Sequence, residues 1–125
     1  MVKEKLINLF AEKIAKMEGF YNPSTISFRN NNPGNLRSWG TVPIFDGYAR
    51  FSTPEGGWIA LREQIRKNVF VRKLTFYEFF AGKKGVYAGY APTDDGNLPA
   101  VYASYVAKAF EVPKETVIAD LVDKV

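Results

Sequence analysis

Two reactive side chains are missing from this sequence of 125 residues: it contains no cysteine and no histidine. Without cysteine there is no disulfide and no thiolate nucleophile. Without histidine there is no imidazole base, no common metal ligand and no Ser-His or Cys-His nucleophile system. No apolar run approaches the roughly 20 residues that a membrane span needs. Any chemistry must therefore rest on Asp, Glu, Tyr, Lys or Arg, and no metal site or cofactor is expected.

The remaining composition predicts one folded domain over residues 1–125. Hydrophobic residues make up 46% of the chain and aromatic residues 15%, which favours a globular core over disorder. The N-terminal stretch MVKEKLINLF places acids and lysines inside its apolar pattern, unlike a signal peptide. We therefore expect a protein made in the cytoplasm, without a signal peptide.

Positive charge is concentrated in one stretch. The whole chain has a net charge of +4. Residues 62–84 contain seven basic residues and two acids, a net charge of +5: Arg62, Arg66, Lys67, Arg72, Lys73, Lys83 and Lys84 against Glu63 and Glu78. This pattern is typical of a solvated helix face, and it also fits a patch that binds a polyanion, either nucleic acid or an anionic cell wall.

Hydrophobic spacing predicts an α+β fold, mainly helical, with one small antiparallel hairpin. A first helix ends at Gly19, which suits a left-handed C-cap. The dipeptide Asp46-Gly47 predicts a tight hairpin turn within VPIFDGYARF. A second helix begins at Thr53 and Pro54, and the glycines that follow suggest that another backbone passes close by.

Three further helices are expected toward the C-terminus. Thr75 and Glu78 predict a capping box for a short third helix that stops at Gly82. The fourth is defined by an apolar stripe, and Pro113 opens a fifth. Their expected buried faces are Leu98, Val101, Tyr102, Tyr105, Val106 and Ala109 in the fourth, and Val117, Ile118, Leu121, Val122 and Val125 in the fifth.

Glu18 occupies an unusual position at the end of the first helix. At 100° per residue it lies about 75° from the centre of the stripe formed by Leu6, Phe10, Ile14 and Met17, at the border of the core. The helix dipole disfavours a negative charge in the last turn. Burial and the dipole both raise the pKa of a carboxyl group, and a carboxylic acid that keeps its proton near neutral pH can protonate a leaving oxygen. A solvated glutamate without a role remains the alternative.

The loop after this helix is rich in amides. Its sequence RNNNPGNLR contains a predicted type II turn with Pro33 at the second position and Gly34 at the third. The asparagines and arginines exceed what a turn needs. The amides either order the loop by bonding its backbone, or bond a polar ligand such as a sugar amide.

These segments resemble a known family. Glu18-Gly19-Phe20, Asn22-Pro23, Ser27 and a Gly-containing loop resemble the catalytic segment of lytic transglycosylases and goose-type lysozymes. More closely, NNNPGNLR, GYARFSTPEGGWIAL and DDGNLPAVYASYVAKAF are similar to phage and prophage proteins with a lysozyme-like domain. The resemblance spans about residues 10–112. It implies a lysozyme-like fold with a cleft between the helical part and the hairpin.

The resemblance also implies roles for single residues. Glu18 takes the role of general acid, and Ser27 either holds the loop or contacts the sugar. Tyr102 is the better candidate for a cleft tyrosine and Tyr90 the weaker, since tyrosines at helical spacing are commonly core residues. Other residues near the predicted hairpin could contribute aromatic platforms and polar donors to a glycan groove: Tyr21, Trp39, Tyr48, Asn32, Asn35 and Arg37.

Hydrolysis usually needs a second carboxylate, but none of the available acids is persuasive. The position of Asp46 indicates a turn residue, and that of Glu55 indicates the start of a helix. Asp94 and Asp95 are expected in a loop or a helix cap. By resemblance, lytic transglycosylases use one glutamate, because a hydroxyl of the substrate attacks and leaves an anhydro sugar.

The expected function is therefore a peptidoglycan-degrading glycosidase of this type. It would cleave the β-1,4 bond between N-acetylmuramic acid and N-acetylglucosamine. It would act as a monomer or part of a virion, reaching the cell wall after phage-dependent release or as a virion component. The alternatives are a non-catalytic phage structural or cell-wall-binding protein and, with least support, a nucleic-acid binder, because no known reading motif is present.

Overall fold

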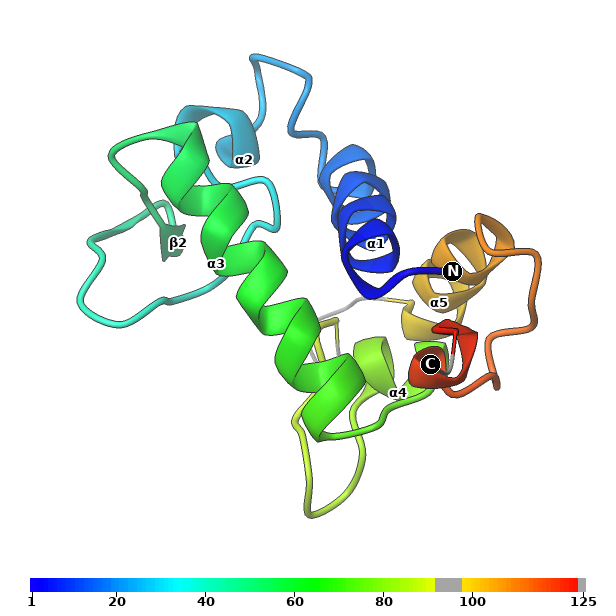
Figure 1. The fold of residues 1–125 in the computed structure, drawn as a ribbon. Coiled ribbons are helices and arrows are strands. Elements are labelled where there is room, and N and C mark those ends of the chain that lie inside the picture. The colour runs from blue at the N-terminus through cyan, green and yellow to red at the C-terminus, as the bar shows by residue number, and fades with distance from the viewer. Residues whose placement is uncertain (92–97, 124–125) are drawn as a thin grey trace. The chain divides into compact units, whose positions relative to one another are not determined.

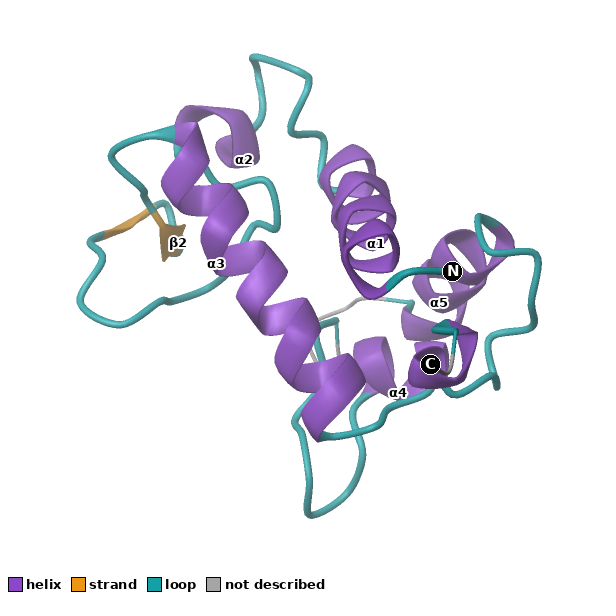
Figure 2. Ribbon diagram, viewed as in Figure 1, coloured by secondary structure: helices purple, strands orange, loops and turns teal. Residues whose placement is uncertain are grey.

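The computed structural model describes residues 1–91 and 98–123, and it has the predicted α+β fold, mainly helical with a small antiparallel sheet (Figures 1 and 2). The elements follow in the order α1 (Lys3–Met17), α2 (Ile26–Arg29), β1 (Ile44–Phe45), β2 (Tyr48–Ala49), α3 (Pro54–Arg66), η1 (Lys67–Val71), α4 (Phe76–Ala81), α5 (Pro99–Lys108) and η3 (Ile118–Leu121). Of these, η1 is a π-helix and η3 a 3₁₀-helix.

The chain divides into two compact units. Unit 1 contains residues Met1–Leu6 and Arg66–Val125, and unit 2 contains Ile7–Ile65. Unit 2 therefore holds the end of α1, the amide-rich loop, the hairpin and most of α3. The expectation of a single domain over residues 1–125 stays a prediction.

In unit 2, the end of α1 has the cap that the sequence predicts. Gly19 has φ +74, its N–H donates to Lys16 O at 3.1 Å, and Phe20 N donates to Ala15 O at 2.9 Å. These two bonds form a Schellman motif, which satisfies carbonyl groups that the helix end would leave unpaired. A Cβ atom at position 19 would also lie 2.9 Å from Thr25 Cγ2. Both the positive φ and this close contact therefore favour glycine at this position.

The hairpin and the start of α3 also follow the sequence. Asp46 and Gly47 both have positive φ, as a type I′ turn requires, and Phe45 pairs with Tyr48. The Thr53 hydroxyl accepts a hydrogen bond from Gly56 N at 3.2 Å and caps α3. The predicted turn and N-terminal cap are therefore confirmed.

In unit 1, α4 begins with the predicted capping box. Glu78 N donates to the Thr75 hydroxyl at 3.0 Å, and Thr75 N donates to Glu78 Oε1 at 2.9 Å. Gly82 ends the helix with φ +93. The short loop that follows returns to the helix, since Tyr90 N donates to Phe79 O at 2.9 Å. Both signals predicted for this helix are confirmed.

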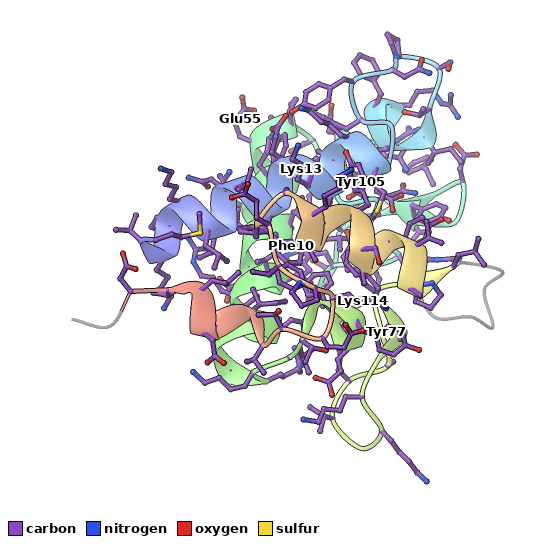
Figure 3. The ribbon with its side chains drawn as sticks, turned by 90° about the vertical axis from the view of Figure 1, so that its right-hand side faces the viewer. Phe10, Lys13, Glu55, Tyr77, Tyr105 and Lys114 are labelled. Carbon is purple, nitrogen blue, oxygen red and sulfur yellow. The ribbon has the colours of Figure 1, made fainter. Side chains whose placement is uncertain are left out.

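The apolar stripe predicted for α5 is partly wrong. The helix buries Pro99, Ala103, Val106 and Ala107. Three residues of the predicted stripe are instead exposed: Leu98, Val101 and Tyr105, the last of which is labelled in Figure 3. Val106 is buried as predicted, and Pro99 and two alanines form the rest of the buried face.

The predicted fifth helix is wrong. Only Ile118–Leu121 form a short 3₁₀ turn. Before it, Thr116 N donates to Pro113 O at 3.1 Å and closes a turn, and Val117 forms an antiparallel bridge with Thr75. The segment also bonds to the start of α4: Phe76 N donates to Thr116 O at 3.3 Å, and Ile118 N donates to Leu74 O at 3.1 Å. These backbone bonds replace the bonds a helix would make. Val125 lies outside the described residues.

In the described part of the chain, the structure contains no helix with the length and apolar character needed to cross a membrane.

Candidate active site

Glu18 is the first residue after α1, and its side chain is half-buried. Burial raises the pKa of this carboxyl group to about 7, and a side-chain hydrogen bond with Asn35 partly opposes the rise. The upward direction predicted from the sequence is confirmed, with burial as its main cause. A carboxyl group with this pKa exchanges its proton in the neutral range, where a general acid works best.

Asn35 is the partner of Glu18, and its backbone is in the left-handed region with φ +48. An ionised carboxylate only accepts hydrogen bonds, so the Asn35 amide group donates to it. The other polar atom of this side chain, Oδ1, is buried without a hydrogen-bond partner among the described residues. A strained backbone and an unsatisfied acceptor are both features that gather at functional sites.

The turn that carries Asn35 differs from the predicted one. Asn35 N donates to Asn32 O at 2.9 Å, which closes a four-residue turn around Pro33 and Gly34. A type II turn needs a positive φ at its third position, but Gly34 has none. The type II prediction is therefore wrong, and the left-handed residue is Asn35, which follows the two central positions.

Ser27 and Asn32 hold this loop from inside. Both are buried, with 1% and 0% of their surface exposed. The Ser27 hydroxyl donates to Asn32 O at 2.7 Å. Asn32 Nδ2 donates to Leu36 O at 3.0 Å and Ala49 O at 2.9 Å, and Asn32 Oδ1 accepts from Leu36 N at 3.0 Å. The structure thus favours loop ordering over sugar contact for both residues.

Two neighbouring asparagines fasten the loop to the hairpin. Asn30 Nδ2 donates to Phe45 O at 3.0 Å, and Asn30 Oδ1 accepts from Arg50 Nε at 3.0 Å. Asn31 Nδ2 donates to Phe51 O at 2.9 Å. The sequence indicated a group of backbone-binding amides here, but it did not assign these two residues. The only available signal was the unbroken run of asparagines.

The predicted close approach to the glycines of α3 is confirmed. A Cβ atom at Gly57 would lie 2.0 Å from Asn31 O and 2.7 Å from Pro33 Cδ. The loop backbone therefore lies directly against the first turn of α3. Because the loop is fixed here, by the asparagine amides and by Ser27, the residue that contacts Glu18 is held on a rigid support.

Of the remaining candidates in unit 2, Arg37 and Tyr48 contact each other at the hairpin. Arg37 is exposed, and its guanidinium lies 4.7 Å from the centre of the Tyr48 ring. Trp39 is half-buried. Tyr21 is 56% exposed and bonds Glu12 rather than a residue of the amide loop. A role for Arg37 in substrate binding stays a prediction.

The two candidate tyrosines belong to unit 1, whereas Glu18 belongs to unit 2. Tyr90 stacks on Phe79 with a centroid distance of 5.3 Å, and its ring lies 6.0 Å from that of Phe80. Tyr102 also contacts Phe80, at 6.3 Å. The two tyrosines therefore share one aromatic cluster. Their predicted role in a cleft stays a prediction.

The candidate second carboxylates have local explanations. Asp46 lies in the exposed hairpin turn, and Glu55 lies exposed in the first turn of α3, where negative charge is favourable. Asp94 and Asp95 lie outside the described residues. Within residues 1–91 and 98–123, no group of three or more acidic, histidine or cysteine side chains could hold a metal ion.

The arrangement can perform proton transfer. One carboxyl group titrates near neutral pH, and an amide donor aimed at it favours its ionised form. The chain matches no family model, and comparisons with curated proteins and with solved structures also find no match.

Proposed function

We propose that this protein is a peptidoglycan-cleaving glycosidase of the lytic transglycosylase type. Its substrate would be the β-1,4 bond between N-acetylmuramic acid and N-acetylglucosamine. The observation that carries the proposal is Glu18, a half-buried carboxyl group at a helix end with a pKa of about 7. The resemblance of its segment to the catalytic segment of lytic transglycosylases supplies the substrate class.

In the first step, protonated Glu18 gives its proton to the glycosidic oxygen as the bond to the anomeric carbon breaks. The leaving sugar departs with a free hydroxyl group. In the second step, the 6-hydroxyl of the muramic acid residue attacks the anomeric carbon, and Glu18, now ionised, takes the hydroxyl proton. The products are a 1,6-anhydro sugar and a new chain end, and Glu18 recovers its starting state.

A single carboxylate meets the needs of both steps. The Asn35 amide stabilises the ionised form of Glu18, and partial burial favours the protonated form. The two effects oppose each other and bring the pKa close to neutral. Because the nucleophile is part of the substrate, no second protein carboxylate is required, in agreement with the local roles of Asp46 and Glu55.

The decisive experiment compares peptidoglycan clearing by the parent protein and by Glu18→Gln. We expect the variant to lose at least about 100-fold in rate, since general acid catalysis contributes roughly 10²–10⁴-fold. The matched control is Asp46→Asn, which removes a carboxylate from unit 2 and leaves Asn-Gly, a sequence well suited to a type I′ turn. Its rate should equal that of the parent.

The outcomes separate the proposal from its rivals. Equal clearing by the parent and Glu18→Gln removes Glu18 from the mechanism. Absence of clearing by both, with retained sedimentation on peptidoglycan, favours a non-catalytic cell-wall-binding protein. Mass spectrometry of released fragments then distinguishes anhydro ends from reducing ends, and a reducing end would mean hydrolysis instead of transglycosylation.

A further inference from the structure

A groove between α1 and α3 in unit 2 plays no part in the chemistry of Glu18. It has a volume of about 540 Å³, within the range of roughly 300–1,000 Å³ typical of small-molecule sites. Its lining comes from one face of each helix: Asn8, Ala11 and Glu12 from α1, and Glu55, Trp58, Ile59 and Arg62 from α3. Figure 3 shows Glu55 projecting from its helix at the surface.

The groove lies along α1 from Glu18 and does not face the opposite side of the helix. At 100° per residue, Ala11 points about 20° from Glu18 around the helix axis, Asn8 about 80° and Glu12 about 120°. At 1.5 Å per residue, these three residues lie about 9 to 15 Å from Glu18 along the axis. A ligand in the groove would therefore be separated from the reacting carboxyl group by distance along the helix.

The apolar part of the lining consists of one aromatic side chain, Trp58, with Ile59 and Ala11. Trp58 lines the groove, and its ring packs edge-on against Phe20 with a centroid distance of 5.5 Å. Beside it, Ile59 is 63% exposed. Phe20 also contacts Tyr21 edge-on at 5.4 Å. The contact with Phe20 therefore restricts the orientation of the Trp58 indole in the groove.

The polar lining combines acceptors and donors. The carboxylate of Glu12 is oriented by Tyr21, whose hydroxyl lies 2.9 Å from Oε1 and 2.8 Å from Oε2. Arg62, on α3, provides a guanidinium donor, and Asn8, on α1 with Glu12, provides an amide with both a donor and an acceptor. A ligand that satisfies this set must itself carry many donors and acceptors along an apolar face.

We propose that this groove is a second carbohydrate site, which binds a β-1,4-linked N-acetylhexosamine strand. Sugar hydroxyl and acetamide groups both donate and accept, and a pyranose ring presents C–H groups that pack on an indole. The lining carries Glu12 and Glu55 against Arg62, a net charge of −1, which favours the uncharged hydroxyl and acetamide groups of a glycan over a nucleic acid. The choice of glycan rests on the proposed function, and the groove would keep the protein on the polymer that Glu18 cleaves.

Tryptophan fluorescence tests the site directly, because the chain has two tryptophans, Trp39 and Trp58. In the Trp39→Phe protein, Trp58 is the sole indole. Titration with a soluble β-1,4 tetramer of N-acetylglucosamine should give a saturable change in its emission. The Trp58→Phe protein reports on Trp39 instead, and any transition seen there belongs to the region of the hairpin and not to this groove. The absence of a saturable change up to about 10 mM tetramer would overturn the proposal. A change with tri-lysine, a cationic peptide that the net negative lining would attract, but not with the tetramer would also overturn it.

Asn8, which is exposed, and Glu12, which is half-buried, test the polar contacts. In the Trp39→Phe background, Asn8→Ala and Glu12→Gln should each weaken tetramer binding about fivefold, as expected when one ligand hydrogen bond is lost. The matched control is Lys13→Ala, which changes the residue next to Glu12 but does not touch the groove lining. Equal affinity in all three variants would contradict the assignment.

This test and the test of the proposed function fail independently. Glu18→Gln should retain the Trp58 response while losing peptidoglycan clearing. Clearing without the Trp58 response would remove the groove and leave the proposed function intact. The Trp58 response without clearing by the parent protein would remove the proposed function and leave a carbohydrate-binding protein.

Discussion

The ends of α1 and α4 both have a glycine with positive φ, but the charged residues beside them have opposite signs. Both helices stop at a glycine with positive φ, Gly19 after α1 and Gly82 after α4. Beyond α4 follow Lys83 and Lys84, both exposed, and Lys83 pairs with Glu78 at 3.9 Å. At the end of α1 stands Glu18, half-buried.

The difference separates a structural helix end from a functional one. Cations near the C-terminus of a helix interact favourably with its dipole, so the lysines after α4 need no further explanation. The ionised form of a half-buried carboxyl group at a helix C-terminus is unfavourable, and the raised pKa of Glu18 is the consequence. A charge that opposes the helix dipole at one of these two helix ends points to function at that end.

The largest expected effect is on stability at Gly82. Its φ of +93 and ψ of 168 belong to a region that only glycine occupies readily, and a Cβ atom there would lie 2.6 Å from Ala88 O. Gly82→Ala should therefore lower the free energy of unfolding by about 3 kcal/mol or more, measured by urea denaturation.

Two matched variants sharpen this result. Gly85 has a φ of +77, and no atom lies within 4 Å of the place a Cβ atom would take. Gly85→Ala should therefore lower the free energy of unfolding by only about 1 kcal/mol. At Gly19 the obstructing atom is a methyl group of Thr25, which can move, and the expected cost is about 2 kcal/mol. Equal losses at Gly82 and Gly85 would mean that the backbone contact at Gly82 contributes nothing.

The next effect is a pH-dependent gain in stability from Glu18→Gln. Because the folded pKa of about 7 lies above the ordinary value of 4.5 for this carboxyl group, the folded protein binds more protons than the unfolded chain between these values. The stability associated with protonated Glu18 is complete below pH 4.5 and is lost as the pH rises through 7. A neutral amide avoids that loss, so the variant should be about 2 kcal/mol more stable than the parent at pH 8.

Urea denaturation at pH 5 and pH 8 measures this gain. The difference between parent and variant should be small at pH 5 and should grow toward pH 8. Asp46→Asn, in the exposed hairpin turn, should show no such growth. A variant that gains stability while losing peptidoglycan clearing would mean that the protein keeps a costly charge for its activity. If the difference in unfolding free energy between parent and variant were the same at both pH values, the charge of Glu18 would not destabilise the end of α1, and the contrast with the end of α4 would be wrong.

Local signals at the helix ends were sufficient to predict both ends from the sequence. Gly19, Gly82 and the pair Thr75–Glu78 act within one turn of chain, where spacing determines the contacts. Glu18 was identifiable for a similar reason, since its position relative to an apolar stripe follows from the helical period. The upward direction of its pKa followed from the same geometry.

Features that depend on distant contacts were missed or only partly predicted. The segment 113–122 has helical periodicity, but backbone bonds from Thr116 and Ile118 to the start of α4 override it. The amides of residues 30–35 were recognised as a group, yet their separate roles depend on which carbonyl each one reaches across the hairpin. Asn35 was proposed as a substrate ligand, and only the structure assigns it to Glu18.

The smallest expected effect concerns the hydrogen bond that opposes the burial of Glu18. Asn35→Gly removes the amide donor and keeps a residue that tolerates φ +48. The ionised carboxylate loses its partner, so the pKa of Glu18 should rise, and the alkaline limit of activity should move to higher pH. Side-chain carbon NMR of labelled glutamate measures the pKa directly. Asn35→Ala should raise it in the same direction and cost about 1 kcal/mol more in stability, because alanine resists a positive φ. An unchanged pKa in both variants would mean that Asn35 shapes the loop alone, and burial would then be the whole reason that the end of α1 differs from the end of α4.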